Sequence, residues 1–262
     1  NKDKAGLVHI LAQMLNESTT KRSAEQMSTE LDKLGSSVYI SPGSKYLNVH
    51  INALTKNLDA TLALVEEKLR FPALKDDEFS RVKSNAIQGA INSKKNPSYL
   101  ASTAYRRLLQ EDNIAAMPIG GTEASLNNIV LNDIKSFYHA QVKPQDGQLI
   151  VVSDLKEKQV MSALSAFQSW QGKGKSLNLT LPTPNTQMGV IYLVNKEGAA
   201  QSAIRIGKRS LTQDVLGEFY KSYLMNFPLG GAFNSRINLN LREDKGYTYG
   251  ARSFFDADKL SG

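Results

Sequence analysis

Residues 5–41, AGLVHILAQMLNESTTKRSAEQMSTELDKLGSSVYIS, contain two helices and the start of a strand pair, and this order decides the fold. Apolar residues recur with helical spacing at Leu7, Ile10, Leu11 and Met14. This spacing places them on one face of a helix, so Gly6–Asn16 is predicted to be helical. A second helix is predicted over Ser23–Leu34, where Gly35 supplies a natural C-terminal cap.

The stretch that follows the glycine has the alternation of a β-hairpin. Apolar residues alternate with polar ones at Val38 and Ile40 and again at Leu47, Val49 and Ile51. The residues between the two runs, 41–44, read Ser-Pro-Gly-Ser, which is a turn composition. Further helices are predicted at Asn57–Phe71, Asp76–Asn92, Pro97–Leu109, Leu131–His139 and Glu157–Trp170.

The rest of the chain predicts a second layer of strands and helices. Strands are predicted at 147–154, 188–195, 201–208 and 247–255, and helices at 214–226 and from Phe233 through Leu241. Composition shifts to Gly, Pro, Ser and Thr at Gln171, so we predict domains at 1–170 and 188–262 joined by a linker at 171–187. The fold class is α+β, with two related two-layer halves in which helices pack on a mainly antiparallel sheet.

Composition excludes several classes of function. The chain has 262 residues, 41% of them hydrophobic, which is enough for a sizeable core. No apolar run approaches the roughly 20 residues that span a bilayer. Zero Cys excludes disulfides and thiolate metal ligands. The net charge of +7 comes from scattered Lys and Arg without an RNA-binding aromatic motif, so no nucleic acid partner is predicted.

The stretch HILAQ, residues 9–13, has the outline of a metal site without its working groups. Residues three and four apart share a helical face, so His9, Ala12 and Gln13 are predicted to lie together opposite the apolar stripe. Zinc peptidases of the inverted type carry His-x-x-Glu-His on such a helix, where both His bind the metal and the Glu activates water. Ala12 cannot accept a proton and a Gln13 amide is a poor zinc ligand. Taken alone, a single helical His is usually a surface or satisfied polar group.

The surrounding sequence resembles the pitrilysin or insulinase family of zinc peptidases. The likeness starts at AGLVHILAQMLNEST and continues through YLNVHINALTKNLDATLALVEEKLRFP, PIGGTEASLNNIVLNDIKSFYHAQVKPQDGQLIVVSDL and VIYLVNKEGAAQSAIRIG, so it covers nearly the whole chain. The resemblance implies a third zinc ligand, a Glu, near Gln88 and Gly89, where this chain has no carboxylate. The degenerate motif therefore predicts no catalytic residue and no metal ligand set in this half.

A second signature of the same family resembles PLGGAFNSRINLNLREDKGYTYGARS near the end of the chain. In the family, an Arg and a Tyr seven positions apart hold the substrate backbone, and Arg242 and Tyr249 match that pair. A guanidinium and a phenol donate hydrogen bonds to carbonyl oxygens, which suits that role. The alternative is structural: Arg242 caps the end of its helix and Tyr249 fills a strand face.

Together these features imply the catalytically degenerate half of a zinc metalloendopeptidase. Such a half binds extended peptide and complements a zinc-bearing partner half, in the same longer chain or as a heterodimer subunit, and Zn²⁺ is expected in that partner. The alternative is a structural scaffold subunit of the family without peptide turnover. The family halves also imply further strands and helices beyond both ends of this sequence, as in a fragment of a larger protein. The compartment is open, with the bacterial periplasm or cell envelope favoured.

Overall fold

The fold is α+β, and the computed structural model describes residues 1–43, 45–111, 113–174, 189–259 and 262. The chain divides into two units, each described below by itself. Unit 1 comprises Asn1–Arg107, Asp112–Leu179 and Leu193–Ala203, and unit 2 comprises Leu108–Glu111, Thr180–Tyr192 and Ile204–Gly262. Within the described ranges, no helix has the length and apolar character needed to cross a bilayer.

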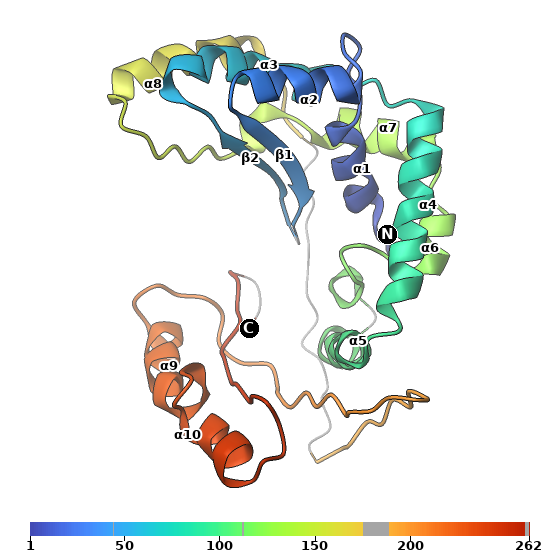
Figure 1. Ribbon diagram of the computed structural model, residues 1–262, viewed down its shortest axis with the longest axis vertical. Coiled ribbons are helices and arrows are strands. Elements are labelled where there is room, and N and C mark those ends of the chain that lie inside the picture. Colours follow the sequence, from blue (N-terminus) through green and yellow to red (C-terminus); the bar gives the residue numbers. More distant parts are fainter. Residues whose placement is uncertain (44, 112, 175–188, 260–261) are drawn as a thin grey trace. The chain divides into compact units, whose positions relative to one another are not determined.

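Most of the regular structure belongs to unit 1 (Figure 1). The longer elements are α1 (Leu7–Asn16), α2 (Ala24–Lys33), β1 (Ser37–Pro42), β2 (Leu47–Asn52), α3 (Leu58–Arg70), α4 (Asp76–Ser93), α5 (Pro97–Gln110), α6 (Glu123–Asn127), α7 (Leu131–Gln141) and α8 (Glu157–Ala163). Short 3₁₀ turns lie at Lys2–Lys4, Thr55–Asn57, Ile114–Ala116, Pro144–Asp146 and Leu164–Ser169. The hairpin and the first four long helices agree with the predicted elements to within one or two residues at each end.

Local sequence explains where α2 begins and ends. Ser23 caps its N-terminus by accepting a hydrogen bond from the Gln26 N–H, and the Gln26 side chain accepts one from the Ser23 N–H. Gly35 has φ of 58°, the left-handed conformation that glycine adopts without a steric cost. The N–H of Ser36 then reaches back to the carbonyl of Leu31 at 3.0 Å. The chain is thereby turned directly into β1.

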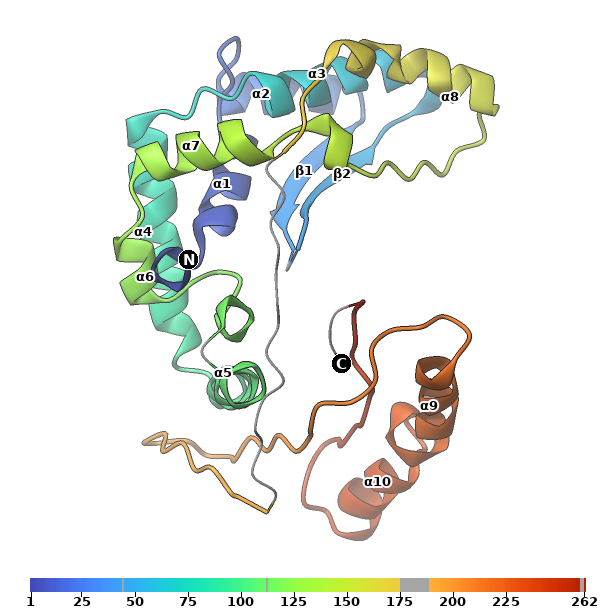
Figure 2. The ribbon, with the colours of Figure 1, turned by 180° about the vertical axis from the view of Figure 1, so that it is seen from behind.

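Helix α1 is the central element of the core of unit 1. It lies between the hairpin and α4, and α7 crosses behind it (Figures 1 and 2). Its buried side chains are Ile10, Leu11, Ala12, Met14 and Leu15. They pack with Ile40 of β1, Val65 of α3 and Ile134 of α7 in one continuous hydrophobic cluster. A ten-residue helix with so few exposed positions is held by tertiary packing rather than by its own propensity.

The side chain of Asn16 joins the end of α1 to β1. Its Nδ2 donates to the Ile40 carbonyl at 2.7 Å, and its Oδ1 accepts from the Ile40 N–H at 3.0 Å. Ile40 lies opposite Val49 in the antiparallel register and directs both backbone groups away from β2. The Asn16 amide therefore makes the two hydrogen bonds to Ile40 that a neighbouring strand would otherwise make on this side of β1.

Unit 2 is built on short helical segments: α9 (Glu218–Asn226), a π-helical segment Phe227–Gly231, α10 (Arg236–Asn238) and a second π-helical segment Leu239–Asp244. Two buried amides organise it. Asn226 donates to the Ser253 carbonyl at 2.7 Å and accepts from the Ser253 hydroxyl at 2.6 Å. Asn238 accepts from the Ala251 N–H at 2.9 Å. These bonds hold the segment after residue 247 against the helices.

The strands predicted at 147–154, 201–208 and 247–255 are wrong for the described chain, as is the described part of 188–195. These segments form no ladder, and β1 and β2 are the only paired strands in the ranges that the structure describes. A short apolar run or an apolar alternation predicts an extended backbone but cannot supply a hydrogen-bonding neighbour. Ile150 and Val152 are 87% and 96% exposed, as expected for strand-like side chains without a covering layer.

Three predicted helices differ in extent from the observed ones. The helix predicted at 157–170 is α-helical only as far as Ala163 and then tightens into a 3₁₀ helix. The helix predicted from residue 214 begins at Glu218, and the one predicted from Phe233 begins at Arg236. Most of the predicted linker, from 175 to 187, lies outside the described residues. The domain boundaries at 170 and 188 stay a prediction.

We predict that Asn16→Ala lowers the free energy of unfolding by about 2–3 kcal/mol, because it leaves the two Ile40 backbone groups buried without partners. Urea denaturation followed by circular dichroism measures this. The matched control is Asn92→Ala on the exposed side of α4, which should change the stability by less than about 0.5 kcal/mol. Equal losses in the two variants would contradict the role of Asn16.

Candidate functional site

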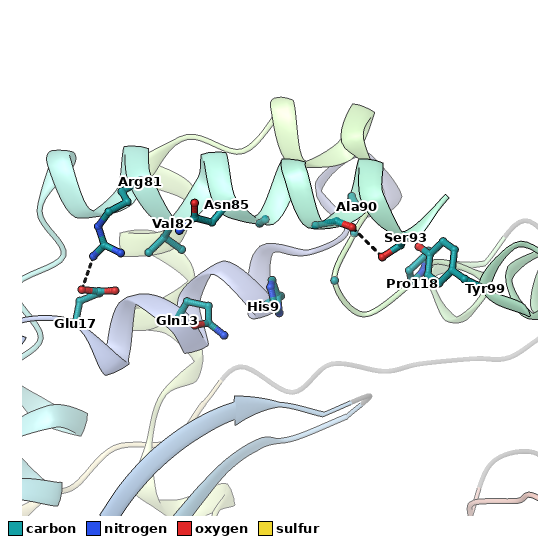
Figure 3. Close-up of a pocket in the computed structure, with 14 residues that line it drawn as sticks. His9, Gln13, Glu17, Arg81, Val82, Asn85, Ala90, Ser93, Tyr99 and Pro118 are labelled. Atoms are coloured by element: carbon teal, nitrogen blue, oxygen red, sulfur yellow. Dashed lines mark hydrogen bonds and ion pairs between the residues drawn. The ribbon is translucent and has the colours of Figure 1, made fainter. Parts of the chain in front are cut away.

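A groove of about 390 Å³ runs along α1 and is the candidate site (Figure 3). Helix α1 contributes His9, Gln13 and Glu17 to it. The facing side of α4 contributes Arg81, Val82, Asn85, Ala86, Gly89, Ala90 and Ser93. Tyr99 of α5 and the loop residues Pro118, Gly120 and Gly121 line the remainder. The spacing on α4 is that of one helical face, so the groove follows from the contact between α1 and α4.

A close crossing of two glycines fixes the start of α1 beside the groove. Gly6, at the N-cap of α1, has φ of 95°, and Gly121 has φ of 78°. A Cβ on Gly121 would come within 2.4 Å of the Ala5 carbonyl oxygen. The buried Ser125 hydroxyl donates to the same carbonyl at 2.8 Å. Only glycine allows this approach, which places the first turn of α1, and with it His9, against the loop before α6.

The structure brings His9 and Gln13 together but separates Ala12 from them. His9 and Gln13 lie one turn apart along the groove, half-buried, with Asn85 across from them on α4 (Figure 3). Ala12 is fully buried in the core beside Leu15, so the prediction that all three share the open face is wrong for Ala12. Ala12 and Gln13 differ by about 100° around the helix, which is enough to divide them between core and groove.

The electrostatics of the groove favour neutral groups at its centre. Burial lowers the pKa of His9 below its ordinary value of 6.5, because the charged imidazolium is poorly hydrated there. At one end, Arg81 and Glu17 form an ion pair at 2.6 Å (Figure 3). Glu17 also faces the buried Lys68, whose ammonium donates to the Asn16 carbonyl at 3.2 Å. Desolvation lowers the pKa of Lys68, and the charges of Glu17 and Glu67 oppose that shift.

The residues present in the groove do not fit a zinc ion. A catalytic zinc site needs three protein ligands, drawn from imidazole, thiolate or carboxylate. At the positions where the family resemblance predicts ligands, the groove is lined by the imidazole of His9, the amide of Gln13 and Gly89, which has no side chain. Among the described residues, no group of three His, Cys, Asp or Glu side chains is close enough to hold a metal. The centre of the groove offers hydrogen bonding by neutral polar groups, and the Arg81–Glu17 ion pair lies at one end.

The structure places Arg242 and Tyr249 in unit 2. Arg242 lies in the π-helical segment, where its guanidinium carbon lies 4.7 Å from the centre of the Phe233 ring. Its Nη1 also lies 3.0 Å from a carboxylate oxygen of Glu243. Tyr249 is 91% exposed in the extended segment after the helices, so it does not fill the face of a strand.

Several residues that shape the two regions were not found by sequence reasoning. Asn85 faces the groove centre. The sequence pattern that could have identified it is its position four residues after Arg81, on the same face of α4. The buried amides of Asn226 and Asn238 carried no such signal, because their partners on residues 251–253 are distant in sequence. From sequence alone, an Asn in a predicted helix is expected to be an exposed surface residue.

The chain belongs to the insulinase family, peptidase family M16. Residues 1–116 match the family model described as "Insulinase (Peptidase family M16)", and residues 128–262 match the one described as "Peptidase M16 inactive domain". Two family domains along one chain agree with the predicted pair of related halves.

Relatives and solved structures show what this chain is similar to. It is 22% identical over 258 residues to "Uncharacterized zinc protease YmxG" of Bacillus subtilis, covering 98% of this chain and 62% of the relative. It is 23% identical over 249 residues to "Non-peptidase homolog YmxG" of Helicobacter pylori, covering 95% and 57%. The crystal structure of a peptidase M16 inactive domain from Pseudomonas fluorescens has the same fold, with a TM-score of 0.83 and 20% identity, over 99% of this chain and 63% of that one. The chain thus spans about three fifths of the length of these proteins.

We predict that stability rises with pH through the window between the lowered pKa of His9 and 6.5. In that window the unfolded state binds the proton that the folded state has released, so raising the pH favours folding. His9→Gln should flatten this part of the curve. Urea titrations at a series of pH values measure the effect, with Ser93→Ala at the far end of the groove as the control. A wild-type curve that overlays that of His9→Gln would show that His9 is not desolvated.

We also predict that the double substitution Gln13→His and Gly89→Glu creates a zinc site together with His9. A side chain fits at residue 89, because a Cβ there would meet no atom within 4 Å. Residue 12 is left unchanged because its side chain is buried. The double variant should bind one zinc per chain in dialysis and metal analysis, and its melting temperature should rise with zinc. The control pair Gln13→Asn and Gly89→Gln should do neither.

Proposed function

We propose that this chain is the non-metal half of a zinc metalloendopeptidase, which holds extended peptide for a zinc-bearing partner half. The contrast between the two units carries the proposal. The groove in unit 1 has one imidazole, no adjacent carboxylate base and an amide at the second ligand position. Unit 2 retains the guanidinium of Arg242 and the phenol of Tyr249 at the family spacing of seven positions. The family match to an inactive domain over residues 128–262 supports the same assignment.

The chemistry of the pair suits an extended polypeptide. Carbonyl oxygens of a peptide backbone accept hydrogen bonds, and both a guanidinium and a phenol donate them. Arg242 carries five N–H donors, and Glu243 is its one ion-pair partner in the described part of the chain. The phenol of Tyr249 lies in a side chain that is 91% exposed. Donors that are free to point at a carbonyl also stabilise the negative oxygen of a tetrahedral intermediate.

The partner in this proposal is a peptidase half with an intact His-x-x-Glu-His helix, in the same polypeptide or as a separate subunit. The zinc, the base and the water belong to that half, and this chain contributes binding and orientation. The second candidate is a structural scaffold subunit of the family. It is supported by the relative named "Non-peptidase homolog YmxG", and it is equally compatible with a groove that lacks the residues for zinc chemistry.

We predict that Arg242→Ala lowers peptide turnover by the assembled halves by about ten- to a thousandfold, the scale of losing one oxyanion donor. Turnover of an internally quenched peptide is measured for the protein that contains this chain, for the zinc-bearing partner half, and for the two combined. Where both halves lie in one polypeptide, each half is also measured separately. The control is Arg209→Ala, another arginine of unit 2. Turnover that is unaffected by adding this chain or by Arg242→Ala would favour the scaffold function.

A further inference from the structure

We infer that Phe233 is a positioning residue for Arg242: its ring is the platform that sets the plane of the guanidinium and leaves its N–H edge for the peptide. This inference rests on the proposed function, because Arg242 needs orientation only if it binds peptide. Phe233 has no assigned role in the family signature described above, and its position before α10 was predicted only as part of a helix.

The first observation is the exposure of Phe233. Its side chain is 66% exposed, although a phenylalanine gains free energy by burial. The one cation over it in the described chain is the Arg242 guanidinium, 4.7 Å from the ring centre. That distance lies within the range of a favourable cation–π contact, in which a planar guanidinium stacks on the negative face of the ring. The ring is thus used as a surface for Arg242 rather than as part of a core.

The second observation is that buried polar contacts fix the backbone of Phe233. Its carbonyl oxygen accepts a hydrogen bond from Asn238 Nδ2 at 2.6 Å, and Asn238 is only 4% exposed. The Oδ1 of the same amide accepts from the Ala251 N–H at 2.9 Å. A single rigid side chain therefore holds both the platform under Arg242 and the segment that carries Tyr249, two residues before Ala251.

The third observation is the position of Glu243. Its carboxylate lies 3.0 Å from Nη1 of Arg242, so an ion pair holds one end of the guanidinium while the ring covers one face. A planar group held at a face and at one end has little freedom to rotate. The remaining N–H donors then point in a fixed direction, and a fixed donor loses less entropy when it binds a carbonyl than a free arginine does.

The platform can be detected without any activity assay. The ring current of Phe233 should shift the Arg242 Nε–H proton upfield in a ¹⁵N-correlated spectrum of the full-length protein, and Phe233→Leu should move this resonance back. Phe254→Leu removes another exposed ring of the same unit, 76% exposed against 66% for Phe233, and should leave the resonance in place. An unchanged Arg242 signal in Phe233→Leu overturns the inference.

Turnover by the assembled halves tests the consequence. Phe233→Leu should lower kcat/KM about two- to fivefold, the scale of an exposed cation–π contact. Phe233→Tyr keeps an aromatic ring and should have the kcat/KM of the wild type. In an Arg242→Ala background, Phe233→Leu should have no further effect. A loss of the same size in both backgrounds would show a structural role and overturn the inference. If Arg242→Ala itself leaves turnover unchanged, the proposed function fails, whereas the spectrum still decides whether the ring orients the guanidinium.

Discussion

The two hydrogen bonds between the Asn16 amide and the backbone of Ile40 are the constraint on which unit 1 depends. They satisfy two backbone groups that β1 turns away from β2, and they tie the C-terminal end of α1 to the sheet. The Gly6–Gly121 crossing fixes the other end of the same helix. With both ends held, the direction in which His9 and Gln13 project is set by the backbone and not by the side chains themselves.

The groove contains the residues at which the family resemblance predicts a metal site, but its side chains supply a different chemistry. Ala12 has become part of the core, so a carboxylate base there would have to be buried. The imidazole of His9 is desolvated and favours its neutral form. Neutral imidazole can bind a metal, but the amide of Gln13 is a poor zinc ligand and Gly89 has no side chain, so one good ligand remains where a zinc site needs three.

In unit 2, side-chain amides hold residues 251–253 in place, although the sequence predicted that this segment would be held by pairing with a neighbouring strand. Asn226 and Asn238 hold the segment that carries Tyr249 through single hydrogen bonds to its backbone. The Arg242 guanidinium is oriented by an aromatic ring and one carboxylate, both within ten residues of it in sequence. The peptide-binding role that we propose for Arg242 depends on these local contacts.

The sequence by itself determined the first five long helices of the chain and the existence of the hairpin, because apolar periodicity, the Ser23 cap and the Gly35 turn are local signals. It also determined that residues 9–13 have one imidazole and no carboxylate or second imidazole, since that depends on side-chain identity alone. Only the tertiary structure decided that Ala12 lies in the core, that Asn85 faces Gln13, and that residues 147–154 and 247–255 form no ladder. These outcomes depend on which segment lies beside which, and a strand or a groove exists only when a distant part of the chain supplies its second side.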